Sequence, residues 1–222
     1  MKTVKNIFTI IVCIIISTNI FSQTEIRNGV VIDHGAQKIV KNVIAQIKKD
    51  TPFSFNFTYN IKDKEIGNKK GSGKFLSYNA KYCITSNDFC HWSNGVTMWN
   101  LIKNKNEVEI MDAEDENTMF NFVKIINRSV NNYRPKLIRQ EIFNKTNCNV
   151  IDLTPKKASS ISKIRIFSSV NNNRIQKMEI STYIGSNYNF TFTSYNTNKT
   201  VNDNNFIFPQ KSYPKVKQID LR

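Results

Sequence analysis

Histidine and glycine are scarce in this chain, with 2 His and 7 Gly among 222 residues. Neither His34 nor His91 has a convincing partner for metal binding, and no His-Glu-x-x-His motif occurs. Gly-x-Ser-x-Gly is also missing, and the run Gly71–Gly73 is too short to cradle a phosphate. These absences predict a protein that is not an enzyme and that uses no metal and no cofactor. An esterase built on an unrecognised Ser/His pair is the alternative that they leave.

The first 22 residues have the pattern of a secretion signal. A short basic start precedes an almost continuously apolar run from Ile7 to Ile16, and Ser22 offers a small residue for cleavage. The apolar run is too short for a comfortable membrane span. A valine precedes Cys13, where a lipoprotein cleavage box needs small residues. We therefore predict an exported protein without a lipid anchor, cleaved after Ser22, in which residues 23–222 form a single domain.

Three cysteines remain after such cleavage, and an odd number does not make a disulfide framework. Cys83 and Cys90 flank the dipeptide Ser86-Asn87, which suits a two-residue hairpin turn. With that turn the two cysteines lie directly opposite each other, so a cross-strand disulfide fits an oxidising compartment. Two unpaired thiols in facing strands fit the same spacing, and both alternatives stay open.

Positive charge is in excess, with a formal net charge of +15. Residues 134–222 carry 15 basic and 5 acidic residues, whereas residues 23–133 carry 15 and 12. A basic half suits nucleic acid, an anionic membrane surface or an acidic partner. Export argues against nucleic acid, and the heavy use of Lys, Asn and Ile throughout makes a general bias of composition the simpler explanation.

An aromatic residue stands at every second position of the segment that runs from Phe53 to Tyr59. Period-two alternation places these side chains on one face of a strand, because successive residues of a strand point to opposite faces. The face carries Phe53, Phe55, Phe57 and Tyr59. Such a face either packs in a thick core or forms the wall of an apolar cavity.

Two segments have the periodicity of amphipathic helices. Residues 33–49 carry the stripe Ile39, Val40, Val43, Ile44 and Ile47, with Asp33 as a candidate N-cap and Pro52 just beyond the end. Residues 118–127 carry the stripe Met119, Phe122, Val123 and Ile126. The acidic cluster at residues 112–116 precedes the second helix and opposes the positive end of its dipole.

Short strand-like runs fill most of the remaining chain, and the dipeptide Asn94-Gly95 and the run Asn171–Asn173 mark turns between them. The predicted strands are 73–78, 81–85, 88–92, 97–102, 107–111, 133–143, 149–153, 162–168, 174–183 and 187–195, with a closing piece at 206–208. This pattern predicts a mainly β protein of the α+β class. One antiparallel sheet would curl toward a barrel, and the two helices would fill its concave side.

Motifs spread over the whole chain after the signal resemble one known family. They are the helix and the aromatic strand in that order, followed by Lys70–Phe75, Lys81-Tyr82, Ser93–Trp99, Glu107–Asp112, Ile151–Lys156, Phe206–Phe208 and the ending Tyr213–Arg222. In this order they resemble LolA, the periplasmic carrier of outer-membrane lipoproteins, in a form like that of Bacteroidota. Ser93–Trp99 and the ending are the most specific pieces.

The resemblance implies an unclosed antiparallel β-barrel with a helical lid over an apolar cavity. It implies a monomeric carrier that takes acylated lipoproteins from an inner-membrane lipoprotein-releasing ABC transporter to an outer-membrane receptor of unknown identity. The residues expected to line the lipid-binding cavity are Phe53, Phe55, Phe57, Tyr59, Phe75, Tyr82, Ile84, Trp99, Ile164, Ile166, Phe190 and Phe192. The lid would present Ile39, Val43, Ile47, Met119, Phe122, Val123 and Ile126.

The chain departs from proteobacterial LolA in one respect. There the segment resembling Gly73–Ala80 carries an arginine that helps to latch the lid, whereas this chain has Tyr78, Asn79 and Ala80. We therefore expect a cavity that is open at rest or closed by apolar contacts alone. A binding or sensory module for another lipid-like ligand on the same fold is the second hypothesis for its function.

Overall fold

The computed structural model describes residues 24–27, 30–65, 67–113, 121–197 and 200–222. The predicted signal segment and Met119 lie outside these residues. Within them, no helix is long and apolar enough to cross a membrane.

The helices and strands follow the predicted order, with additions at both ends of the chain. The first part comprises β1 (Thr24–Arg27), β2 (Val30–Asp33), α1 (His34–Asp50), β3 (Phe53–Asp63), β4 (Gly67–Tyr78), β5 (Lys81–Ser86), β6 (Cys90–Ser93), β7 (Thr97–Ile102), the 3₁₀ turn η1 (Lys103–Lys105) and β8 (Glu107–Asp112). The second comprises α2 (Phe122–Asn132), β9 (Tyr133–Phe143), β10 (Thr146–Pro155), β11 (Ile161–Ser169), β12 (Ile175–Thr182), β13 (Asn187–Thr197), η2 (Asp203–Phe206), η3 (Gln210–Ser212) and β14 (Lys217–Asp220).

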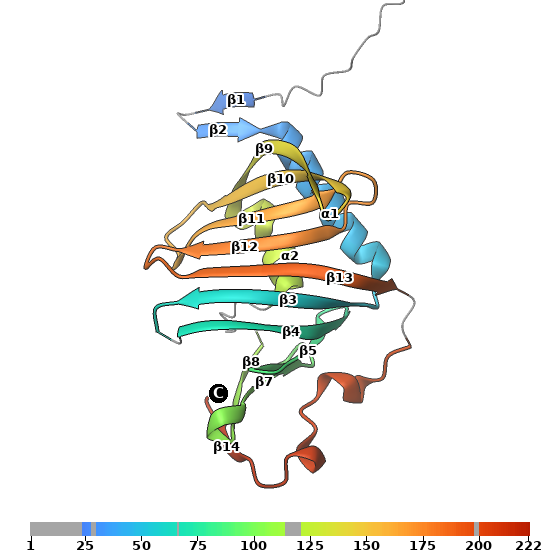
Figure 1. Ribbon diagram of the computed structural model, residues 1–222, viewed down its shortest axis with the longest axis vertical. Helices are drawn as coiled ribbons and strands as arrows, with labels where there is room; N and C mark the ends of the chain where they lie inside the picture. Colours follow the sequence, from blue (N-terminus) through green and yellow to red (C-terminus); the bar gives the residue numbers. More distant parts are fainter. Residues whose placement is uncertain (1–23, 28–29, 66, 114–120, 198–199) are drawn as a thin grey trace, which may run out of the picture.

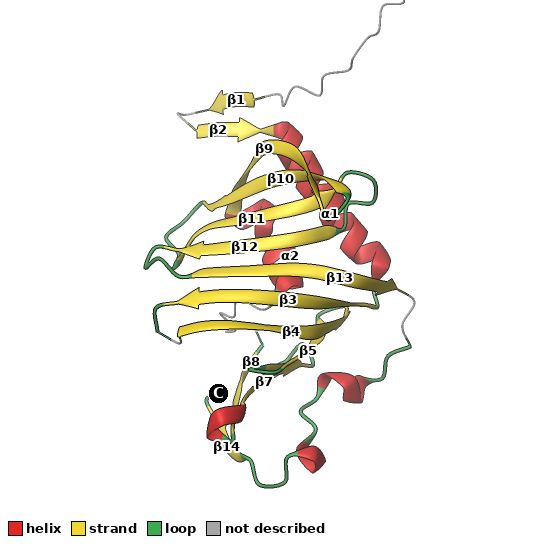
Figure 2. Cartoon of the chain, viewed as in Figure 1, coloured by secondary structure: helices red, strands yellow, loops and turns green. Residues whose placement is uncertain are grey.

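Twelve of the described strands form one curved sheet, in the order β14-β8-β7-β6-β5-β4-β3-β13-β12-β11-β10-β9. Both helices lie on the same face of this sheet, and the short β1–β2 hairpin stands beyond the β9 edge (Figure 1; Figure 2). Neighbouring strands are antiparallel except β14 and β8, which are parallel. The sheet is not closed, because β14 and β9 each have a neighbour on one side only. The predicted mainly β, unclosed architecture is therefore the observed one.

Asp33 fixes the start of α1 and ties it to the edge of the sheet. One carboxylate oxygen accepts a hydrogen bond from the backbone N–H of Ala36 at 2.8 Å, as an N-cap does. The other oxygen accepts one from the backbone N–H of Leu137 on β9, at 2.9 Å. The capping role predicted for Asp33 is confirmed, and the same side chain also positions the helix over the sheet.

The second helix begins later than the sequence pattern predicts. It runs from Phe122 to Asn132, and the side chain of Asn121 accepts a hydrogen bond from the backbone N–H of Lys124 at 2.9 Å. No acidic residue stands in its first turn. Residues 114–116 of the acidic cluster lie outside the described residues, so the prediction that the cluster opposes the dipole of this helix stays a prediction.

The two faces of the sheet differ in what covers them. On the inner face, defined here as the face beneath α1 and α2, one large apolar cluster joins residues of both helices to residues from most of the strands. On the outer face, the chain after β13 crosses β6 to β8, and Phe208 packs against Trp92 with their ring centroids 5.4 Å apart. The predicted closing piece at 206–208 is thus not a strand, whereas β14 was not predicted.

Candidate functional site

The aromatic face of β3 forms the middle of the inner apolar cluster. Phe53, Phe55, Phe57 and Tyr59 are all buried, and the residues between them are more exposed, so the predicted alternation is confirmed. Phe55 stacks on Phe75 of β4 and also contacts Phe192 of β13, with centroids 4.8 Å apart in both pairs. The strands on both sides of β3 therefore continue its aromatic surface.

Phe122, the first residue of α2, inserts into this aromatic surface. Its ring centroid lies 4.9 Å from that of Phe190, 5.1 Å from Phe192 and 5.5 Å from Phe75, in edge-to-face geometry. Such pairs add about 0.5–1.5 kcal/mol each beyond the burial of their area. Phe122 therefore acts as a plug in the centre of the inner face.

Two glycines on β4 give the β3 rings room to lie across the neighbouring strand. Gly73 pairs with Phe57 and Gly71 pairs with Tyr59. A Cβ atom at Gly73 would stand 2.6 Å from Cζ of Phe57 and 2.7 Å from the backbone oxygen of Thr85. The absence of side chains at these positions thus widens the aromatic surface by one strand.

An apolar crevice of about 20 Å³ lies on the inner face, between the end of α1, the start of α2 and the ends of three strands. This volume holds about one water-sized group. The crevice is lined by Gln46, Ile47, Phe53, Phe55, Phe122, Val123, Asn173, Arg174, Ile175, Phe192 and Tyr195. An acyl chain would enter here only if side chains or a helix moved.

An ion pair closes the crevice where α1 ends. Arg174 donates two hydrogen bonds to the carboxylate of Asp50, at 2.8 and 3.1 Å, and its guanidinium lies 4.8 Å from the ring centroid of Tyr195. Asp50 is buried, and its hydrogen bonds raise the pKa of Arg174. Burial raises the pKa of the Tyr195 hydroxyl. The expectation of an open cavity, or of closure by apolar contacts alone, is therefore wrong, because Arg174 anchors the helix.

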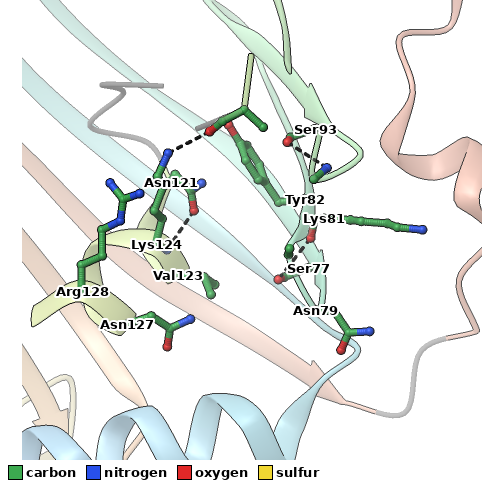
Figure 3. A pocket seen from close by; sticks show the side chains of 13 residues that line it. Ser77, Asn79, Lys81, Tyr82, Ser93, Asn121, Val123, Lys124, Asn127 and Arg128 are labelled. Carbon is green, nitrogen blue, oxygen red and sulfur yellow. Dashed lines mark hydrogen bonds between the residues drawn. The ribbon is translucent and has the colours of Figure 1, made fainter. Parts of the chain in front are cut away.

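A separate polar pocket of about 230 Å³ lies on the other side of α2's first turns, against the β4–β5 and β6–β7 turns (Figure 3). Its walls carry Ser77, Asn79, Ala80, Lys81, Tyr82, Ser93, Gly95, Ala113, Asn121, Val123, Lys124, Asn127 and Arg128. Tyr82 borders this pocket while its hydroxyl reaches the sulfur of Met98 at 3.2 Å. Sequence reasoning did not predict the pocket, because its residues come from turns far apart in the chain.

Most of the residues predicted to line a cavity do lie together on the inner face. The apolar cluster there contains Phe53, Phe55, Phe57, Tyr59, Phe75, Tyr82, Ile84, Ile164, Ile166, Phe190 and Phe192, together with Val43, Ile47, Phe122 and Ile126 from the helices, and Ile39 and Val123 pack against it. Whether these residues bind lipid stays a prediction. Trp99 does not join them. It pairs with Trp92 and packs in the outer cluster, so its assignment to the cavity is wrong.

The cysteines Cys83 and Cys90 are free thiols. The loop between β5 and β6 is centred one residue later than predicted, so Cys83 pairs with Trp92 and Cys90 pairs with Thr85. The two cysteines are therefore diagonal neighbours on the outer face, and the disulfide alternative is wrong. Burial raises the pKa of Cys83 to about 12, which keeps its thiol protonated.

Tyr195 is an inner-face residue that simple alternation misses. Counting by twos from Phe190 and Phe192 leads to Ser194, but the pairing of β13 with β3 shifts between Thr193 and Asn196. Ser194 adopts a positive φ of 51°, as the extra residue of a bulge does. The bulge turns Tyr195 inward, where its ring stacks on Phe53 at 5.4 Å.

Across the residues that the structure describes, no three His, Cys, Asp or Glu side chains gather as a metal site would require. His91 is buried beside Phe89, and burial lowers its pKa to about 4. It is therefore a neutral core residue at physiological pH.

The fold and the candidate site define the class of this protein. It has an unclosed, mostly antiparallel sheet, and two helices cover the apolar inner face of that sheet. Neither a family model nor a curated protein matches the sequence. Among solved structures, an uncharacterized conserved protein from Thermus thermophilus is similar with a TM-score of 0.57 and 7% identity, over 84% of this chain and 99% of that chain. At this identity the likeness is one of fold alone.

Two further solved structures are similar with lower scores. A LolA superfamily protein from Nitrosomonas europaea has a TM-score of 0.41 and 13% identity, over 78% of this chain and 97% of that chain. The lipoprotein LppX from Mycobacterium tuberculosis has a TM-score of 0.45 and 10% identity, over 77% of this chain and 98% of that chain.

Proposed function

We propose that this protein is a periplasmic carrier that binds the acyl chains of lipoproteins on its inner face and moves them from the inner to the outer membrane. The observation that carries the proposal is the plugged aromatic surface: Phe122 of α2 sits among rings from β3, β4 and β13. Acyl chains would take the place of this plug when the helices move.

The energetics suit reversible exchange. Burying an acyl chain of about 16 carbons contributes about 12 kcal/mol before any costs, at about 0.8 kcal/mol per methylene. Displacing α2 exposes Phe122 and Ile126, which are buried at rest, and this cost offsets part of the gain. A carrier needs such an offset, because it must release its cargo to the next partner.

The remaining parts of the proposal rest on the sequence. Cleavage after Ser22 would leave residues 23–222 as a single domain in the periplasm. The motif resemblance to the Bacteroidota form of LolA supplies the partners: acylated lipoproteins, an inner-membrane ABC transporter that releases them and an outer-membrane receptor. The protein would act as a monomer.

Depletion of the protein in its native host tests this function. Outer-membrane lipoproteins should then accumulate in the inner membrane, and a plasmid copy of the wild-type protein should restore their distribution. Unchanged sorting of lipoproteins after depletion would contradict the proposal.

A further inference from the structure

The polar pocket and the apolar crevice meet at one residue. Val123 lines both, with the crevice on its side toward α1 and the polar pocket on its side toward the β4–β5 turn. Phe53 of the crevice and Ser77 of the pocket are also paired across β3 and β4. A single residue therefore separates the apolar crevice from the polar pocket. A ligand with an apolar tail and a polar head would contact both.

The walls of the polar pocket are cationic. Lys124 and Arg128 of α2 and Lys81 of β5 line it, and no carboxylate lines it among the described residues. Lys81 also pairs with Asp203 at 2.7 Å, and Lys124 donates to the backbone oxygen of Ala113 at 2.8 Å. Arg128 lines the pocket and is exposed, so its guanidinium is accessible to an anion that enters the pocket (Figure 3).

Asparagine and serine side chains complete the pocket. Asn79, Asn121 and Asn127 lie around the cations, and the Asn121 carbonyl oxygen is already engaged by the backbone N–H of Lys124. An arginine fork and amide groups together suit the oxygens of a carboxylate or a phosphate. The pocket of about 230 Å³ has room for such a group.

We propose that this pocket binds the anionic head group of an acyl ligand whose chain crosses Val123 into the crevice. The inference rests on the proposed function and adds to it a class of ligand: an amphiphile with a carboxylate or phosphate beside its acyl chain. A polar head group that followed the chain into the apolar interior would lose its hydrogen bonds with water. The ligand therefore needs a polar binding site next to the site of its acyl chain.

Amphiphiles with one chain and different heads test this inference on the purified wild-type protein. Dodecyl phosphate and dodecanoate are compared with dodecyl maltoside and dodecyltrimethylammonium by titration calorimetry, below their micelle concentrations. The anionic compounds should bind about tenfold more tightly than the maltoside, and the cationic compound should bind most weakly.

Two variants assign the preference to the pocket. Arg128→Gln and Lys124→Gln should each weaken binding of the anionic compounds about fivefold and leave dodecyl maltoside unchanged. Lys105→Gln removes the same charge from η1, outside the pocket, and should change none of these affinities. Thermal melts of all three variants confirm that they fold.

Competition distinguishes the two sources of the anion. Displacement of dodecyl phosphate by inorganic phosphate indicates a phosphate head, and displacement by an N-acetylated acidic dipeptide indicates a carboxylate of the cargo peptide; either result supports the inference. Equal binding of all four amphiphiles, or a preference that persists in Arg128→Gln and Lys124→Gln, overturns it and leaves the proposed function standing. Binding of none of the amphiphiles overturns both.

Discussion

Arg174, just before β12, holds the carboxylate of Asp50, the last residue of α1, although 124 positions separate them in the chain. The pair anchors the end of the helix at the crevice that leads to the inner face. No motif in the sequence indicated that an ion pair would hold the end of α1 at this position. An ion pair thus adds to the aromatic packing that holds the helices over the inner face.

Replacing Arg174 by Met should destabilise the protein and loosen α1. The change removes the cationic partner of the buried carboxylate of Asp50 and leaves it with the hydrogen bond from Gln46, which costs about 3 kcal/mol. Urea denaturation measures the loss. The double variant Asp50→Asn with Arg174→Met should regain most of it, because no buried charge remains. Equal losses in the single and double variants would show that the ion pair does not set the stability of this end.

A charge on the inner face should abolish acyl binding. Phe57→Glu or Phe192→Glu places a carboxylate where chains would be buried, and a desolvated charge is strongly unfavourable there. Thr58→Glu is the matched control, because its side chain is exposed on the same strand. Binding of a fluorescent fatty acid measures the effect. If Phe57→Glu and Phe192→Glu still fold and bind like the control, the inner face is not the site.

Removing the Phe122 ring should show whether the inner face is a binding surface or an ordinary core. Phe122→Ala should lower the free energy of unfolding by about 3–4 kcal/mol, since it removes a buried ring. If the ring occupies the place of an acyl chain, the same variant should bind the fluorescent fatty acid more tightly and faster than the wild type. A loss of stability without any gain in binding would assign Phe122 to packing alone.

His91 should make the protein less stable as the pH falls from 6.5 to 4. Burial lowers its pKa to about 4, so in this window the unfolded chain binds a proton that the folded chain does not. The stability that His91 contributes is complete above pH 6.5 and declines by about 3 kcal/mol on the way to pH 4. His91→Gln should lose that part of the pH dependence in urea titrations. Parallel profiles for the two proteins would contradict the assignment.

The sequence predicted what alternation and periodicity determine. The aromatic face of β3, the buried stripe of α1 and most strands follow from the spacing of apolar residues, because each strand or helix buries one face. Trp99 shows the limit of this reasoning. Its strand was predicted correctly, but the chain after β13 covers the outer face and buries apolar residues there too, so hydrophobicity alone did not tell the faces apart.

The spacing of apolar residues along the sequence did not predict strand register or long-range contacts. A hairpin loop centred one residue later moved Cys83 away from Cys90, and a bulge at Ser194 turned Tyr195 inward. The Asp50–Arg174 pair and the polar pocket join segments that are far apart in the chain. Such contacts depend on the order of strands in the sheet, which no local pattern of residues specifies.

Mass spectrometry of organic extracts from the protein, purified from its native host, tests the central claim most directly. If the inner face carries lipoprotein acyl chains, the extract should contain diacylglyceryl or N-acylated peptides. The same purification of Phe57→Glu, confirmed as folded by its circular dichroism spectrum, should yield none. An extract of the wild-type protein without acylated peptides would contradict the account.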